Sequence, residues 1–328
     1  MKHLDLYLAT ANGFVLCKGD GDGWRMAGQS LTGRDTTTLI ARQGLILAGT
    51  TEGVFRSDDE GQTWSEASAG LSHHHLRWLA YHPDISDREF AGAEPASIFV
   101  SRDGANSWQE CREVAEMRDR FKWFLPYSPR AGCVRGFAFH GSRAYAAVEV
   151  GGVLRSDDGG ATWRLAGGSD GNPDLDGPPP GSSLIYPDLH SIHVHPSSPD
   201  LVFAPTGGGL YRSADGGQTW TCLYDCYCRA MWLDPADPDH LILSPADNVD
   251  TNGRIEETRD GGQTWRPASH GLTVPWPRHM VERFAQIEES LFAVLSNGKV
   301  LSAPLTTLEW QPFLPEIKNV NAVTTMAD

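Results

Sequence analysis

The sequence predicts an all-β protein, a seven-bladed β-propeller whose C-terminal inner strand closes the N-terminal blade. Segments similar to GGLYRSADGGQTW (208–220) recur along the 328 residues, and the tryptophans that end them are 40 to 57 residues apart. A period near 45 residues, built of short alternating runs and tight turns, is typical of a four-stranded blade. The seven tryptophans are Trp24, Trp64, Trp108, Trp163, Trp220, Trp265 and Trp310.

Each repeat has a turn of defined composition before its tryptophan. The pattern is Ser/Thr-x-Asp-x-Gly-x-Thr-Trp, as in Ser57, Asp59, Gly61, Thr63 and Trp64. An aspartate hydrogen-bonds the backbone of its own turn, glycine adopts the left-handed conformation, and tryptophan covers the outer layer of the blade. We therefore expect these aspartates to be structural rather than catalytic or calcium-binding.

These turns resemble the Asp-box, or BNR, repeat of sialidase-like propellers. Four copies match the pattern well. The third copy has Ala105 in place of the glycine, the first is displaced, and the last keeps only Trp310. The resemblance covers almost the whole chain, and it implies the fold rather than an activity.

The order of strands within a blade follows from the same repeat. The third strand precedes the turn, and the fourth begins at the tryptophan. A connection then leads to the innermost strand, such as SIHVHP (191–196), and a turn leads to the second strand, such as LVFAPT (201–206). The inner strands end in turn sequences rich in proline, so the histidines there are expected to be structural. These histidines are His82, His140 and His195.

The two ends of the chain predict how the ring closes. Residues 4–10 (LDLYLAT) form a second strand without an inner partner, and residues 319–328 form an inner strand without the rest of a blade. The last segment should therefore complete the first blade and remove the open sheet edges. We expect residues 1–328 to form a single propeller.

Two long insertions on the top face lengthen the third and fourth intervals. The insertion at about 112–132 opens with an amphipathic helix, and the one at 167–189 is so rich in glycine and proline that it resembles a lid or rim. Aromatic residues near this rim would either stack a sugar or anchor the loops. They are Trp123, Tyr127, Tyr186 and Trp276.

Alignment of the inner strands predicts which side chains face the channel, because alternate residues of a strand point the same way. The layer at the channel mouth is Thr36, Arg77, Arg135, His190, Arg229 and Glu282, with Asn319 or Asn321 closing the circle. A neighbouring layer contains Arg34, His75, Cys133, Asp188, Tyr227 and Met280. A third layer is Leu79, Phe137, Ile192, Met231 and Phe284. The channel should be polar at its mouth and apolar below.

The arginines in these layers predict a site for a small anion. Guanidinium groups bind carboxylate, phosphate or sulfate bidentately, and a cleft concentrates their field. The alternative is that the arginines pair with Glu282, Asp188 and Asp225 and simply fill the channel. The candidate ligand-binding residues are Arg34, Arg77, Arg135 and Arg229.

Histidines from separate blades predict a second kind of site. We expect His75, His190 and His279 to be candidate ligands of a divalent transition metal, with Glu282 or Asp188 as a fourth ligand or a base. The alternative is that the HHH tract at 73–75 is a solvated loop. Three cysteines fit no zinc motif and are expected to be small buried thiols. They are Cys222, Cys226 and Cys228.

The resemblance to sialidases also implies candidate catalytic residues. Sialidases hold a substrate carboxylate with an arginine triad and pair a tyrosine nucleophile with a glutamate. The corresponding groups here would be Tyr227 and Glu282, beside the mouth arginines. His190 is the third candidate, because it belongs to the mouth layer.

Composition limits the function classes. The net charge of -15 argues against nucleic acid and anionic membranes as partners. No export signal and no long apolar segment is evident, so we expect a cytoplasmic protein with its six cysteines reduced. The favoured function is binding of a small anionic ligand at the channel mouth, and metal-assisted hydrolase or lyase chemistry at that site is one option alongside binding alone. The alternatives are a protein-binding scaffold, like the photosystem assembly-factor propellers, and a sialidase-like glycosidase.

Overall fold

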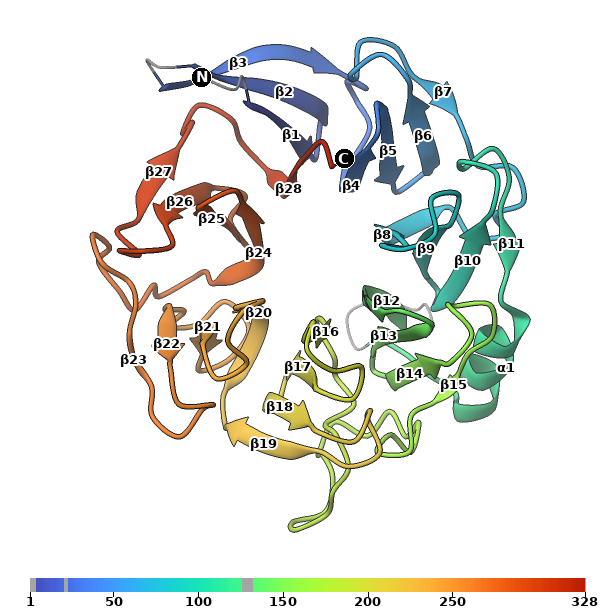
Figure 1. Ribbon diagram of the computed structural model, residues 1–328, viewed down its shortest axis with the longest axis vertical. Coiled ribbons are helices and arrows are strands. Elements are labelled where there is room, and N and C mark those ends of the chain that lie inside the picture. Colours follow the sequence, from blue (N-terminus) through green and yellow to red (C-terminus); the bar gives the residue numbers. More distant parts are fainter. Residues whose placement is uncertain (1–3, 21–22, 126–131, 328) are drawn as a thin grey trace.

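The computed structural model describes residues 4–20, 23–125 and 132–327. Over these residues the chain forms seven four-stranded sheets, which stand as blades in a ring (Figure 1). Neighbouring strands within a blade are antiparallel, as β1 and β2 are in the first blade. The predicted all-β, seven-bladed propeller is confirmed.

The strands of each blade run from the innermost to the outermost in the following order. Blade 1 consists of β28 (Val320–Thr325), β1 (Leu4–Thr10), β2 (Gly13–Asp20) and β3 (Gly23–Ser30). Blade 2 consists of β4 (Thr36–Arg42), β5 (Leu45–Thr50), β6 (Gly53–Ser57) and β7 (Ser65–Glu66). Blade 3 consists of β8 (His75–Tyr81), β9 (Glu89–Glu94), β10 (Ser97–Ser101) and β11 (Gln109–Glu110). Blade 4 consists of β12 (Cys133–His140), β13 (Arg143–Glu149), β14 (Gly152–Ser156) and β15 (Arg164–Leu165).

The remaining three blades have the same order. Blade 5 consists of β16 (His193–Val194), β17 (Val202–Thr206), β18 (Gly209–Ser213) and β19 (Thr221–Tyr224). Blade 6 consists of β20 (Tyr227–Leu233), β21 (Leu241–Ala246), β22 (Glu256–Thr258) and β23 (Arg266–Pro267). Blade 7 consists of β24 (Val281–Ile287), β25 (Ser290–Leu295), β26 (Val300–Pro304) and β27 (Gln311–Phe313).

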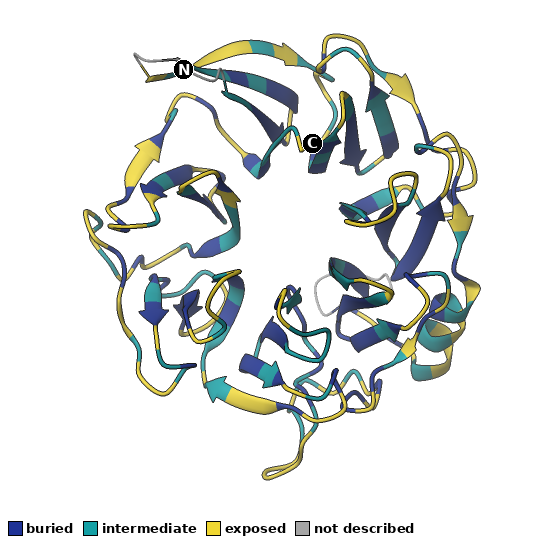
Figure 2. Cartoon of the chain, in the orientation of Figure 1, coloured by how far each residue is buried: buried dark blue, intermediate teal, exposed yellow. Residues whose placement is uncertain are grey.

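The hydrophobic core lies between neighbouring blades. Every residue of β9 and of β21 is buried, whereas outermost strands such as β7 are exposed (Figure 2). Tryptophans of the repeat tie one blade to the one before it. The Trp108 indole donates a hydrogen bond to the Ala67 carbonyl at 2.8 Å, and the Trp310 indole donates one to the Ala268 carbonyl at 2.9 Å.

The C-terminal strand closes the ring as predicted. β28 pairs antiparallel with β1, so that Leu8 lies opposite Val323. Val320 and Val323 are buried in one cluster with Leu6 and Leu8. The innermost strand of blade 1 therefore comes from the end of the chain, while the other three strands come from its beginning (Figure 1).

The aspartates of the repeat hold their own turns, which confirms their expected structural role. In blade 4, Asp158 accepts hydrogen bonds from the Ser156 hydroxyl at 2.7 Å and from the Thr162 backbone amide at 2.9 Å. The Thr162 hydroxyl donates to the same carboxylate at 2.6 Å. The equivalent bonds occur in the turns centred on Asp59, Asp103, Asp215 and Asp260.

These turns predict acid sensitivity. Although burial raises the pKa of Asp158, hydrogen bonds from Thr162 and Ser156 lower it to about 2, from an ordinary value of 3.8. A carboxyl with a depressed pKa stabilises the fold above the unfolded-state value, and this contribution is lost as the pH falls from about 4 towards 2. Asp158→Ala is expected to lower the free energy of unfolding by about 1–2 kcal/mol at pH 7 and to weaken the pH dependence below 4.

Urea denaturation at several pH values measures both effects. Glu66→Ala, in the exposed strand β7, is the matched control and should change neither. An Asp158→Ala protein as stable as the wild type at pH 7 would contradict the structural role of this carboxylate.

The two insertions differ as expected. The first begins with helix α1 (Arg112–Phe121), whose Glu113 carboxylate accepts a hydrogen bond from the Trp163 backbone amide at 2.9 Å. The second, 167–189, contains no named strand or helix. Buried Trp123 joins them by donating a hydrogen bond to the Gly171 carbonyl at 2.9 Å.

Within the described residues no helix has the length and apolar character needed to cross a membrane.

Candidate functional site

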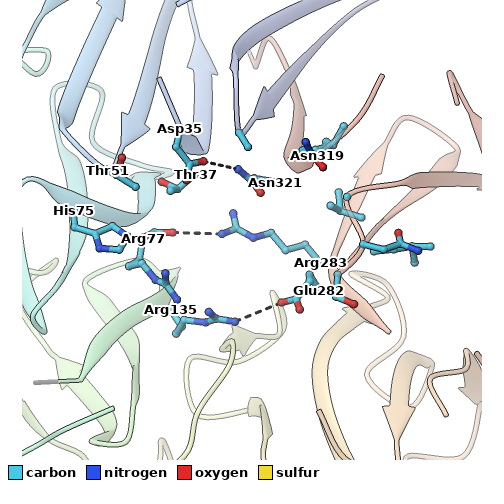
Figure 3. A pocket seen from close by; sticks show the side chains of 17 residues that line it. Asp35, Thr37, Thr51, His75, Arg77, Arg135, Glu282, Arg283, Asn319 and Asn321 are labelled. Carbon is cyan, nitrogen blue, oxygen red and sulfur yellow. Dashed lines mark hydrogen bonds and ion pairs between the residues drawn. The ribbon is translucent and has the colours of Figure 1, made fainter. Parts of the chain in front are cut away.

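A pocket with a volume of about 730 Å³ lies at the inner ends of five blades, and we refer to it as the central pocket. Its walls come from blades 1, 2, 3, 4 and 7, and they carry many polar side chains (Figure 3). The polar lining residues are Asp35, Thr37, Thr51, His75, Arg77, Arg135, Glu282, Arg283, Ser296, Asn297, Asn319 and Asn321. Such a volume is typical of small-molecule sites.

A β-bulge presents a side chain from each of five inner strands at this level. In β8 the pairing with β9 shifts register between Leu76 and Trp78, which leaves Arg77 as the extra residue. Equivalent shifts occur around Thr37 in β4, Arg135 in β12 and Glu282 in β24, and around Arg229 with its neighbour in β20. Bulges redirect side chains and occur often beside functional sites. Four predicted mouth residues, Arg77, Arg135, Arg229 and Glu282, therefore lie at bulges. In β4 the bulge presents Thr37 to the pocket, whereas the predicted Thr36 is buried.

Each mouth arginine faces a glutamate. Arg77 lies 3.6 Å from Glu94, and the Arg229 guanidinium contacts the Glu282 carboxylate. Arg135 lies 3.5 Å from Glu149 and 3.7 Å from Glu282. Glu282 is an arginine partner, as the sequence suggests. The other two partners are Glu94 and Glu149 rather than the expected Asp188 and Asp225. The arginines are thus neutralised by their own protein.

Glu94 and Glu149 were not identified from the sequence, although a signal for them exists. Each is the last residue of a second strand, β9 or β13. In three other blades this position is a threonine, whose hydroxyl donates to the carbonyl three residues later. The replacement of a turn-forming threonine by glutamate marks the two blades that supply counter-ions. The three threonines are Thr10, Thr50 and Thr206.

The charges of the central pocket nearly balance. Burial raises the pKa of Glu282, but Arg229 and Arg135 outweigh burial and hold it below its ordinary value, so the carboxylate is ionised at neutral pH. Arg283 reaches across the middle of the pocket (Figure 3), donates to the Arg77 carbonyl at 3.4 Å and lies 4.2 Å from the Trp78 ring. Burial, together with Arg135, lowers the pKa of Arg283 to about 9.

The three candidate catalytic residues lie in one network. Arg229 Nε donates to the Tyr227 hydroxyl at 3.0 Å, and that hydroxyl lies 3.3 Å from His190 Nε2. Arg229 also contacts Glu282. Burial raises the pKa of Tyr227, so its phenol is protonated at neutral pH. Glu282 lines the central pocket, whereas His190 and Tyr227 lie beside it, nearer blades 5 and 6.

The predicted metal-binding histidines do not come together. His75 lies 3.6 Å from Glu94, and His279 stacks on Trp276 with ring centroids 5.0 Å apart. Burial, then Lys299, lowers the pKa of His279. The part of the chain that the structure describes contains one group with metal-ligand geometry, formed by Glu149, Asp188 and His190.

Two further expectations are corrected by the structure. Arg34 does not line the pocket: it precedes β4, where strand alternation does not apply, and it contacts Glu52 and lies 4.6 Å from the Phe55 ring. Cys222 is exposed, whereas Cys228 is buried as expected.

Among the rim aromatics, Trp123 and Trp276 are buried anchors, and Tyr186 donates a hydrogen bond to the Leu175 carbonyl. Tyr127 lies outside the described residues.

No protein-family model matches this chain. The probable oligoxyloglucan-reducing end-specific xyloglucanase of Neosartorya fischeri is 22% identical over 330 residues, which cover 85% of this chain and 37% of that protein. The enzyme of the same name from Emericella nidulans is 21% identical, over 75% of this chain and 34% of its own length. The chain therefore spans about a third of the length of these curated relatives.

Solved structures show the same fold at low sequence identity. An ancestral GH74 enzyme superposes with a TM-score of 0.63 and 16% identity, covering 98% of this chain and 40% of its own. YCF48 from Cyanidioschyzon merolae superposes with a TM-score of 0.61 and 13% identity, covering 93% of this chain and 97% of its own. Both structures are similar to this chain in their propeller fold.

Proposed function

We propose that this chain is a glycoside hydrolase-type propeller whose central pocket binds a neutral oligosaccharide. The observation that carries the proposal is the internal pairing of the arginines with Glu94, Glu149 and Glu282. Arg77 and Arg135 line the pocket and already face carboxylates, which reduces the positive potential available to an anion. The pocket still offers charge-assisted hydrogen bonds, which suit sugar hydroxyls.

The rest of the lining supports the same ligand class. Asn321 and Thr37 provide amide and hydroxyl groups, and Asn321 is held in place by bonds to Asp35 Oδ1 at 3.2 Å and to the Thr36 carbonyl at 2.8 Å. The Thr37 hydroxyl and the Asn321 amide donate their hydrogens to protein oxygens, so their own oxygens remain as acceptors for sugar hydroxyls. The sequence similarity to xyloglucanases over 85% of this chain points to a neutral glycan.

We assign hydrolysis to two carboxylates at the pocket. Asp35 and Glu282 stand on opposite sides of the central pocket, with Arg283 between them (Figure 3). Glu282 is kept ionised by its arginines and would stabilise positive charge on the sugar or activate water. Asp35, whose Oδ1 accepts a hydrogen bond from Asn321, is the second carboxylate at the pocket and would complete the pair. We also assign the repeated turns to the Asp-box class, which is supported by the shared hydrogen-bond pattern of five turns.

Isothermal titration calorimetry with xyloglucan-derived oligosaccharides tests the proposal. We expect binding of neutral oligosaccharides and weaker binding of uronic-acid oligosaccharides, phosphate and sulfate. Asn321→Ala and Asp35→Asn should each weaken binding by about tenfold, because each removes hydrogen bonds inside the pocket. Product analysis with the same oligosaccharides tests for hydrolysis, which Glu282→Gln should abolish.

Arg34→Ala is the matched control, since Arg34 does not line the central pocket. It should leave saccharide affinity unchanged. Tighter binding of an anion than of any neutral saccharide would contradict the proposal and favour an anion site. Binding to no saccharide at all would contradict it as well.

A further inference from the structure

Three metal-ligating side chains meet beside the central pocket, between blades 4 and 5. Glu149 ends β13, and Asp188 and His190 belong to the connection that enters blade 5. One ligand atom from each of the three lies within 4.8 Å of the others. This cluster is separate from the residues that line the central pocket.

The hydrogen bonds of His190 fix its tautomer. Its side chain is 1% exposed, and Nδ1 lies 2.8 Å from the Cys228 carbonyl oxygen. A carbonyl oxygen only accepts hydrogen bonds, so Nδ1 carries a proton and Nε2 is the nitrogen left to bind a metal through its lone pair. Metal-binding histidines are commonly oriented in this way, by a bond from the other ring nitrogen to a backbone carbonyl.

The atom opposite this lone pair is another acceptor. His190 Nε2 lies 3.4 Å from Asp188 Oδ2. Two acceptors in a buried site repel each other unless a proton or a metal cation lies between them. The Tyr227 hydroxyl, 3.3 Å from Nε2, can donate its single proton to His190, but this leaves the contact with Asp188 uncompensated. A proton on Nε2 or a metal cation between the two atoms would compensate this contact, and Glu149 places a third ligand atom within 4.8 Å for a cation.

The backbone holds the ligands in this position. Glu149 and Asp188 form an isolated antiparallel bridge, the Gly207 amide donates to the Asp188 carbonyl at 2.9 Å, and the His190 amide donates to Pro205 at 3.0 Å. Gly207 also leaves room for the Asp188 carboxylate, since a Cβ at residue 207 would lie 2.3 Å from Oδ2. The site is thus prearranged by rigid elements.

Glu149 is oriented by its own neighbours. The Cys133 thiol donates to Glu149 Oε2 at 3.1 Å, and Arg135 Nε lies 3.5 Å from the same oxygen. Hydrogen bonds of this kind fix ligating carboxylates around metals. Arg135 also connects this carboxylate with Glu282 in the central pocket.

The geometry points to a binding site for a divalent transition-metal cation at Glu149, Asp188 and His190, with Zn²⁺ as the best match. A tetrahedral zinc ion with bonds of about 2.1 Å separates its ligands by about 3.4 Å, which is the distance between His190 Nε2 and Asp188 Oδ2. One imidazole with two carboxylates favours zinc or manganese over calcium or magnesium. Three protein ligands leave a fourth position for water.

Calorimetric titration of chelator-treated, full-length protein with ZnCl₂ tests this site. We expect one zinc ion per chain, a higher melting temperature, and much weaker binding of Mg²⁺. Asp188→Asn and Glu149→Gln preserve side-chain shape and should each weaken zinc binding by at least about tenfold. Gly207→Ala should do the same, because it places a methyl group against the Asp188 carboxylate.

Two controls keep the result specific. Asp176→Asn changes an exposed carboxylate of the same connection, and His74→Ala removes an exposed imidazole from the HHH tract. Both should retain full zinc affinity. Circular dichroism of each variant verifies the fold. The proposal is overturned if the wild type binds no zinc, or if Asp188→Asn and Glu149→Gln bind it as tightly as the wild type.

Discussion

A chain shortened to end at Asn319 is expected to lose the whole ring rather than one blade. The deletion removes β28, the innermost strand of blade 1, and exposes the hydrogen-bonding edge of β1. It also removes Val320 and Val323 from the cluster that contains Leu6 and Leu8. Burial of two valines alone contributes about 3–6 kcal/mol, a large share of the roughly 5–15 kcal/mol that stabilises a typical domain.

Thermal denaturation and limited proteolysis measure this loss. We expect the shortened chain to be protease-sensitive throughout and to lack a cooperative melting transition at 25 °C or above. Asn321→Ala, which retains β28, is the control and should melt cooperatively. A shortened chain that melts within a few degrees of the full-length protein would show that β28 is dispensable for closure.

Substitution of Glu282 is expected to have the second largest effect. Glu282 contacts Arg229 and lies 3.7 Å from Arg135, and its side chain is 22% exposed. Removal of the shared carboxylate leaves two partly buried guanidinium groups close together, so Glu282→Gln should lower the free energy of unfolding by about 3 kcal/mol at pH 7. The surface pair of Arg34 with Glu52 offers a matched control, because Glu52→Gln should cost no more than about 1 kcal/mol.

The ion pairs of Glu282 also predict a pH dependence of stability. Arg229 and Arg135 hold the pKa of Glu282 below its ordinary value of 4.5, despite the opposing effect of burial. The stabilisation is therefore complete above about pH 4.5 and is lost as the pH falls through the folded-state pKa. Urea denaturation of wild type and Glu282→Gln should give curves that converge in acid. A constant difference between them from pH 7 to pH 3 would exclude ionisation of Glu282 as the cause.

The fold could be predicted because the repeat encodes it locally. Five turns have an aspartate, a small residue and a tryptophan at fixed spacing, and the seven regularly spaced tryptophans give the number of blades. Even the third copy, where Ala105 replaces glycine, adopts the left-handed conformation with a φ of 63°. Closure could be predicted because an unpaired inner strand at one end matches an unpaired edge at the other.

The mouth layer could be predicted only in part. Arg77, Arg135, Arg229 and Glu282 can be predicted because each stands at the same distance before the turn that ends its inner strand, and each strand bulges at that level. Simple alternation turns Arg283 away from the pocket, and the bulge at Glu282 is what lets both residues reach it.

Other site features depend on contacts between distant segments. Glu149 and Asp188 meet through a bridge between a second strand and a long connection, which no local pattern reveals. Arg34 and His279 precede their strands, so alternation says nothing about where their side chains point.

The most direct test of the proposed function is a crystal structure of the protein with a xyloglucan heptasaccharide at saturating concentration. We expect electron density for sugar in the central pocket, within hydrogen-bond distance of Asp35, Asn321 and Glu282. Density bound elsewhere on the propeller, or an empty pocket at saturation, would contradict it.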